Sequence, residues 1–164
     1  MSIVTTRPSQ PLTSSHAASH EEHRVIHEAI LILERKLIRG KVFDKPNSVK
    51  RFCQLQIAGD LDECFCCLFL SNQHKLISFE RLFQGTISSA SVYPRVVVRR
   101  ALELNAAAVI FTHNHPSGGC DPSEADYRIT QRLKEALALV EVRVIDHIVV
   151  AHSGCISIAE QGRL

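Results

Sequence analysis

The run AAAVIFT at residues 106–112 constrains the fold more than any other feature, because it is short and almost wholly apolar. Runs of this kind are typical of a central strand that is buried in a sheet. Helical and strand-like patterns alternate on both sides of it. This alternation predicts one α/β (α+β) domain in which helices flank a mixed central β-sheet. The 164 residues are enough for one such domain with a hydrophobic core.

The N-terminal part of the chain is expected to lie outside this domain. Residues 1–20 are rich in Ser, Thr, Pro and Ala, which predicts a disordered tail. Residues 21–42 place apolar side chains at helical spacing and predict an N-terminal helix that stops at Gly40. The domain itself is therefore expected over residues 43–164.

Periodicity predicts the remaining elements of the domain. Residues 48–59 should form a helix that buries Val49, Phe52 and Leu55 on one face. Two apolar runs on either side of SNQHK predict an antiparallel hairpin within residues 63–86. We also expect helices at 93–106 and 121–140 and strands at 142–150 and 156–158.

The helix expected at 121–140 has the clearest start signals. Asp121 is suited to cap it, Pro122 to occupy its first position, and Glu124 to complete a capping box.

Charge and cysteine usage argue against several classes of protein. The net charge of +2 is too small to favour nucleic-acid binding, and no apolar stretch is long enough to span a bilayer. The N-terminal residues lack the apolar segment of a secretory signal, so we expect a cytoplasmic protein whose six cysteines form no disulfides. Cys64 and Cys67 lie three apart on an expected strand and so face opposite sides, which argues against a zinc knuckle.

Two histidines follow the central strand in FTHNHPSGGCDPSEAD, residues 111–126. Residues two apart on an extended segment face the same side, so His113 and His115 can direct both imidazoles at one point. Imidazole is the commonest metal ligand among side chains. Gly118 and Gly119 let the chain turn back towards the next helix.

Asp126 is the more informative residue because of its place on that helix. It shares the expected core face with Ile129 and Leu133, and a carboxylate on a core face needs a partner. Two His and one carboxylate with an open fourth position form the ligand set of a catalytic zinc site. The alternative is a polar turn in which Asp126 caps a backbone group or pairs with an Arg.

The spacing of His113, His115 and Asp126 resembles the JAMM motif of the JAB/MPN metalloprotease-like family, in which His-x-His is followed after ten residues by Asp. The segments HNHPSG, PSEAD, LFQGT, VYPR and IDHIVV together look like the RadC branch of that family, in particular its short, prophage-type members. The resemblance covers residues 43–164.

This resemblance implies the JAB/MPN (cytidine deaminase-like) architecture. It also implies a zinc-dependent hydrolase that cleaves peptide or isopeptide bonds in a protein or peptide substrate. Zinc would bind His113, His115 and Asp126, with water in the fourth position.

Further roles follow from the same resemblance. Glu63, before the first apolar strand, would be the general base, and Ser123 would donate a hydrogen bond to the oxyanion. Glu80 is the competitor for the base, although a solvated position in the hairpin is its plainer interpretation. Asp146 and His147 are adjacent on a strand and should not both face inward, and one of them could orient a ligand histidine.

The alternative function is a non-catalytic zinc-binding or scaffold protein associated with mobile-element DNA processing. No strong signal in the sequence favours nucleic acid or a membrane as a partner. Exposed strand edges and the N-terminal helix allow a homodimer.

Overall fold

The computed structural model describes residues 24–25, 40–43, 45–85, 92–116 and 118–164. The chain divides into two units, Met1–Lys36 and Leu37–Leu164, and of the first unit only residues 24–25 are described, both of them helical. The expected tail at 1–20 lies outside the described residues, as does the expected helix at 21–42 except for residues 24–25 and 40–42. Val42 forms an isolated β-bridge with Lys75, so the end of the expected helix at residue 42 is wrong. Gly40 is described, and its φ of +84° is the left-handed conformation that suits a glycine.

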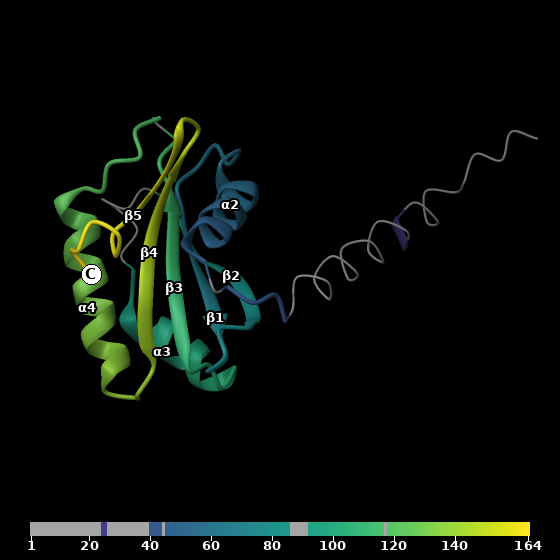
Figure 1. Ribbon diagram of the computed structural model, residues 1–164, viewed down its shortest axis with the longest axis vertical. Helices are drawn as coiled ribbons and strands as arrows, with labels where there is room; N and C mark the ends of the chain where they lie inside the picture. The colour runs from purple at the N-terminus through teal and green to yellow at the C-terminus, as the bar shows by residue number, and fades with distance from the viewer. Residues whose placement is uncertain (1–23, 26–39, 44, 86–91, 117) are drawn as a thin grey trace, which may run out of the picture. The chain divides into compact units, whose positions relative to one another are not determined.

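The second unit contains a mixed five-stranded sheet with helices on both faces, which confirms the expected α/β class (Figure 1). The strand order is β2-β1-β3-β4-β5, and β3 and β4 form the parallel pair. In chain order the described elements are α2 (Pro46–Ile57), β1 (Cys64–Leu70), β2 (Leu76–Gln84), α3 (Pro94–Glu103), β3 (Ala108–Asn114), α4 (Glu124–Ala138), β4 (Arg143–Ala151) and β5 (Gly154–Ser157).

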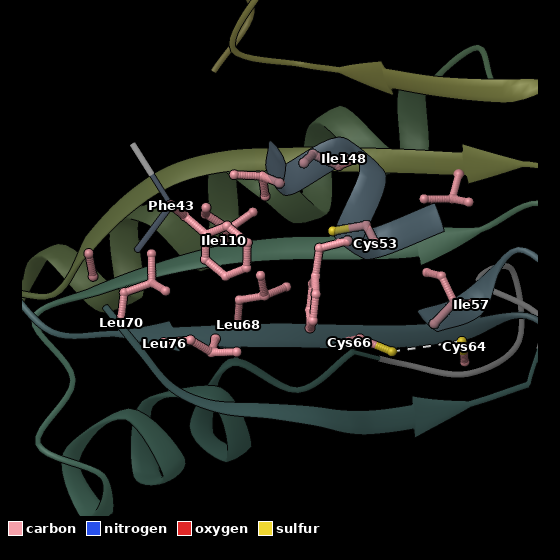
Figure 2. Packing of buried hydrophobic residues seen from close by; sticks show 14 residues of the cluster. Phe43, Cys53, Ile57, Cys64, Cys66, Leu68, Leu70, Leu76, Ile110 and Ile148 are labelled. Carbon is pink, nitrogen blue, oxygen red and sulfur yellow. Dashed lines mark hydrogen bonds between the residues drawn. The ribbon is translucent and has the colours of Figure 1, made fainter. Parts of the chain in front are cut away.

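Strands β1 and β3 are buried along their whole length because both faces of the sheet are covered. Alternate side chains of β1 enter two separate cores, so Cys64 packs under α2 while Cys67 packs on the side of α3 and α4. Figure 2 shows the first core, where Phe43, Cys53 and Ile57 meet the strands. The opposite facing of Cys64 and Cys67 is as expected, and all six cysteines are free.

The face that α2 buries differs in part from the one expected. Val49 and Phe52 are buried, but Leu55 is 80% exposed, and Ile57 takes its place in the core. Each step of three residues falls about 60° short of a full turn, so two such steps carry a side chain off the buried face. Mixed steps of three and four residues keep the stripe in line.

Helix α4 begins two residues later than the sequence suggested. Its N-cap is Ser123, whose hydroxyl accepts a hydrogen bond from the N–H of Asp126 at 3.2 Å, and the Asp126 carboxylate accepts one from the N–H of Ser123 at 2.7 Å. The expected cap at Asp121 and the expected box residue Glu124 are therefore wrong. A capping box needs its acid three residues after the cap, and the cap here is Ser123.

The connection from β3 through α4 to β4 places the candidate site. The C-terminal end of β3 and the first turn of α4 lie at the same edge of the sheet, which is where open α/β sheets bind their ligands. In the part of the chain that the structure describes, no helix has the length and apolarity needed to cross a membrane.

Candidate metal centre

Three side chains from β3 and α4 converge at this edge of the sheet. His113 lies near the end of β3, His115 follows directly after the strand, and Asp126 is in the first turn of α4. The His113 Nε2 atom is 2.9 Å from His115 Nε2 and 3.2 Å from Asp126 Oδ1. Among the described residues this is the group that could hold a metal ion, with ligand atoms all within 4.8 Å of one another.

The sheet and the following loop fix the place of His115. Its backbone N–H donates to the carbonyl of Val150 at 2.7 Å, so the pairing with β4 continues one residue past the end of β3. Gly118 has a φ of +100°, which turns the chain back towards α4. The Ser153 hydroxyl donates to the carbonyl of Gly118 at 2.9 Å and ties this turn to the loop between β4 and β5.

The two carboxylate oxygens of Asp126 have different surroundings. Oδ2 accepts hydrogen bonds from the backbone N–H and the hydroxyl of Ser123, each at 2.7 Å. Oδ1 is buried, and no described group donates a hydrogen bond to it. The residue is 1% exposed, so water cannot readily solvate this oxygen, and an orphan buried acceptor of this kind calls for a cation or a proton.

The tautomer of His113 follows from a chain of hydrogen bonds behind it. Thr130 Oγ1 is 2.5 Å from the carbonyl oxygen of Asp126, which can only accept, so the hydroxyl hydrogen points there. The hydroxyl oxygen then accepts from Nδ1 of His147 at 2.5 Å. His147 Nε2 is left with its lone pair and accepts from Nδ1 of His113 at 2.8 Å. In neutral His113 the lone pair is therefore on Nε2.

A backbone carbonyl fixes His115 in the same tautomer as His113. Its Nδ1 lies 2.8 Å from the carbonyl oxygen of Gly119, which only accepts, so Nδ1 carries the hydrogen and Nε2 the lone pair. Two imidazole lone pairs and the orphan oxygen of Asp126 thus face one another without a hydrogen to share. Three convergent acceptors fit a bound cation.

Burial keeps the two inner histidines neutral. It lowers the pKa of His113 to about 4, with the neighbouring Asp126 opposing the change and His115 adding to it. Burial also lowers the pKa of His147 well below its usual value. Phe65 stacks on the His113 ring and meets the His147 ring edge-on, with centroids 6.4 and 5.5 Å apart. Neutral imidazole is the form that binds a metal.

Glu63 lies at the same end of the sheet as this group and is not one of the three residues that could hold the metal. It is half-buried and directly precedes β1, and its carbonyl accepts from the N–H of Gly85 at 2.9 Å. Phe65, two residues later, pairs with His113 across the sheet. Position 63 is thus on the edge of the sheet where the histidines lie.

Glu80 forms an ion pair with Arg100 of helix α3. Its interpretation as a solvated residue of the hairpin was therefore wrong. Its two carboxylate oxygens accept from Nε and Nη2 of Arg100 at 2.8 and 2.5 Å, and one also accepts from the Ser78 hydroxyl. The hydrogen bond from Arg100 is the main cause of the lowered pKa of Glu80. A carboxylate that stays ionised against a guanidinium is a poor proton acceptor.

Asp146 and His147 are both buried, which corrects the expectation that only one could face inward. They point to opposite faces of β4, and both faces are covered. His147 contacts His113, and Asp146 accepts hydrogen bonds from Ser157 and from the N–H of Ala159 on the other side.

Asn114, between the two histidines, points to the face opposite theirs. Its Oδ1 accepts from the N–H of Cys64 at 2.8 Å, and its Nδ2 donates to the carbonyls of Asp60 and Asp62 at 3.2 and 3.1 Å. The side chain therefore fixes the backbone on both sides of Glu63 to the strand that carries the histidines.

Sequence reasoning missed Asn114 and Thr130. Thr130 is four residues after Asp126 on the same face of α4, so helical spacing could have found it as a polar residue on a core face. Nothing in the sequence marks the partners of Asn114, because they come from the start of β1 and the loop before it, at least 50 residues away.

Comparison with known proteins gives one family. The model of the family described as RadC-like JAB domain matches residues 43–163. A UPF0758 protein of Vibrio cholerae serotype O1 is 54% identical over 143 residues, which make up 87% of this chain and 90% of that protein. A second UPF0758 protein of that organism is 48% identical over 156 residues, or 94% of this chain and 99% of its own.

Other relatives are longer than this chain. A UPF0758 protein of Methylibium petroleiphilum is 57% identical over 132 residues, which are 80% of this chain but only 60% of that protein. The names of these relatives state no activity.

Proposed function

Because the chain belongs to the RadC-like JAB domain family, we propose that it is a zinc-dependent hydrolase that cleaves peptide or isopeptide bonds in a protein or peptide substrate. One observation carries the proposal: the Nε2 lone pairs of His113 and His115 and the orphan Oδ1 of Asp126 converge on one point. Two neutral imidazoles, one carboxylate oxygen and an open fourth position suit a catalytic zinc ion. When bound there, zinc would lower the pKa of a water molecule towards neutrality.

Glu63 is the proposed general base, which accepts the proton of the attacking water and returns it to the leaving amine. Its position on the same sheet edge as the histidines supports this role, and the ion pair between Glu80 and Arg100 counts against the competitor. Ser123 is the proposed donor to the oxyanion. Its hydroxyl hydrogen is directed at Asp126 Oδ2, so the hydroxyl must rotate before it can donate to a substrate oxygen.

Metal analysis tests the site. We expect close to one zinc ion per chain in the purified, zinc-reconstituted protein and none in His113→Ala or Asp126→Ala. Asp121→Ala is the matched control, because it removes an exposed carboxylate of the same loop that is no proposed ligand, and it should keep its zinc. A wild-type protein that holds no zinc after reconstitution would refute the proposal.

Glu63 is tested by Glu63→Gln on a mixed library of quenched-fluorescence peptides with α-peptide or Lys ε-isopeptide bonds. We expect full zinc content and a rate reduced by roughly 100-fold or more, the usual size of a general-base effect. Glu80→Gln, the matched control, should retain the wild-type rate. Equal rates for Glu63→Gln and wild type would remove Glu63 from the mechanism.

The same measurements address the non-catalytic alternative. Stoichiometric zinc without turnover of any library member would favour a zinc-binding or scaffold protein.

A further inference from the structure

A continuous series of hydrogen bonds behind the metal centre connects two of its proposed ligands, His113 and Asp126. The path runs from His113 Nδ1 to His147, from His147 Nδ1 to Thr130, and from the Thr130 hydroxyl to the backbone carbonyl of Asp126. It joins three elements, since these residues lie on β3, β4 and α4. His147 is fully buried and Thr130 is 2% exposed, so bulk water has little access to the path.

We propose that Thr130 and His147 are positioning residues that hold His113 in the tautomer presenting Nε2 to the cation. The inference rests on the proposed function, because the cation is the one that the centre would bind there. It extends that function by assigning roles to two residues that touch neither the substrate nor the ion.

The direction of every hydrogen in the path is set at its Thr130 end. The carbonyl of Asp126 can only accept, so the Thr130 hydroxyl hydrogen is committed to it, and the hydroxyl oxygen can then only accept from His147. One hydroxyl group therefore determines the tautomers of two imidazoles in succession.

Without the Thr130 hydroxyl, His147 is no longer held in one tautomer. His147 could then carry its hydrogen on Nε2, which would make Nδ1 of His113 an acceptor and move the hydrogen of His113 to Nε2. His113 in that tautomer has no lone pair for the cation. The loss of this one hydrogen bond is enough to change the populations of the two tautomers.

His115 provides an internal control within the same protein. Its Nδ1 hydrogen is held by the carbonyl of Gly119, which is not part of the path. A variant at Thr130 should therefore change the tautomer of His113 and leave that of His115 unchanged.

The test compares Thr130→Val, which keeps the shape of the side chain but has no hydroxyl, with Thr130→Ser, which restores the hydroxyl. Imidazole nitrogen NMR shifts of the zinc-free protein near neutral pH report which nitrogen of each histidine carries the hydrogen. We expect a mixed or reversed tautomer at His113 in Thr130→Val and the wild-type tautomer in Thr130→Ser. Thr130→Ala is a second variant without the hydroxyl, should the valine protein fold poorly.

Zinc affinity, measured by competition with a chromophoric chelator, is the second readout. We expect Thr130→Val to bind zinc about 10-fold or more weakly, the size of effect known for residues that orient metal ligands, and Thr130→Ser to recover most of that loss. Unchanged tautomers in Thr130→Val would overturn the inference, even if zinc affinity fell, because the loss would then come from packing. A wild-type protein without zinc affinity would refute the proposed function, while the tautomers would still decide the role of Thr130.

Discussion

The two oxygens of the Asp126 carboxylate have different surroundings and different roles. One oxygen caps helix α4 through Ser123, and the other faces the two histidines with no hydrogen bond of its own. Sequence reasoning offered capping and metal binding as alternatives, but the geometry allows both because the oxygens are separate. A carboxylate with one oxygen engaged can give a cation only one ligand atom, which suits zinc better than Ca²⁺, since Ca²⁺ takes six to eight oxygens.

The orphan oxygen leads to a prediction about Asp126→Asn. An asparagine can keep its carbonyl oxygen on Ser123 and direct its amide at Nε2 of His113, where Asp126 Oδ1 now lies 3.2 Å away. The substitution would replace one of the three acceptors that face one another with a donor, and it would remove a buried negative charge. We expect the metal-free variant to be more stable than metal-free wild type by about 1 kcal/mol, measured by urea unfolding in the presence of a chelator.

The same substitution should abolish zinc binding, so that added zinc stabilises the wild type but not Asp126→Asn. A metal-free Asp126→Asn protein that unfolds at lower urea than wild type would show that the orphan oxygen is not a source of instability.

At the level of the elements, periodicity predicted most helices and strands, and the deviations have local causes. The buried run that became β3 and the hairpin of β1 and β2 were predicted because apolar runs and turn residues mark them. The exposure of Leu55 was not predicted, because it depends on the exact rotation of each residue around the axis of α2. The start of α4 was not predicted either, because two residues close together, Asp121 and Ser123, are both suited to cap it. The three residues of the candidate metal site could be predicted because their spacing along the chain is local.

Asn114 shows what local patterns leave out. Its side chain joins β3 to the loop before β1 through contacts that only the folded sheet brings together. The side chain is 2% exposed, and its removal would take a hydrogen-bond partner from the N–H of Cys64 and from the carbonyls of Asp60 and Asp62.

We therefore expect Asn114→Ala to lower the free energy of unfolding by about 2–4 kcal/mol, since each buried group left unpaired costs about 1–3 kcal/mol. The amide hydrogen of Cys64 should also exchange faster with solvent. Asn72→Ala is the matched control: Asn72 makes one exposed contact with Arg143 and should change stability by less than about 0.5 kcal/mol. Equal stability of the two variants would contradict the role given to Asn114.

At the scale of the whole molecule, the buried histidines make the metal-free protein sensitive to acid. The pKa of His113 is about 4 in the folded protein, against an ordinary value of 6.5, and that of His147 is also lowered. Between these values the unfolded chain binds more protons than the folded one, so stability falls as the pH falls. Each such histidine contributes a slope of up to about 1.4 kcal/mol per pH unit.

Urea unfolding of the metal-free protein should show this loss already in the upper half of that window, where Asp and Glu with ordinary pKa values near 4 do not yet titrate. His147→Gln should unfold with a weaker pH dependence than wild type. A wild-type stability that stays constant across this range would mean that the two rings become protonated without unfolding.

The residues of the candidate metal site and the residues proposed to position them all lie in one continuous segment, β3–α4–β4, whereas Glu63 precedes a hairpin earlier in the chain. This division has a consequence for how such proteins diversify. A single substitution at Glu63, the proposed base, would leave every residue of the candidate metal site in place. A hydrolase of the proposed kind would thereby become a metal-dependent binding protein in one mutational step. The reverse change would also need only one substitution, so the two functions would be one mutation apart.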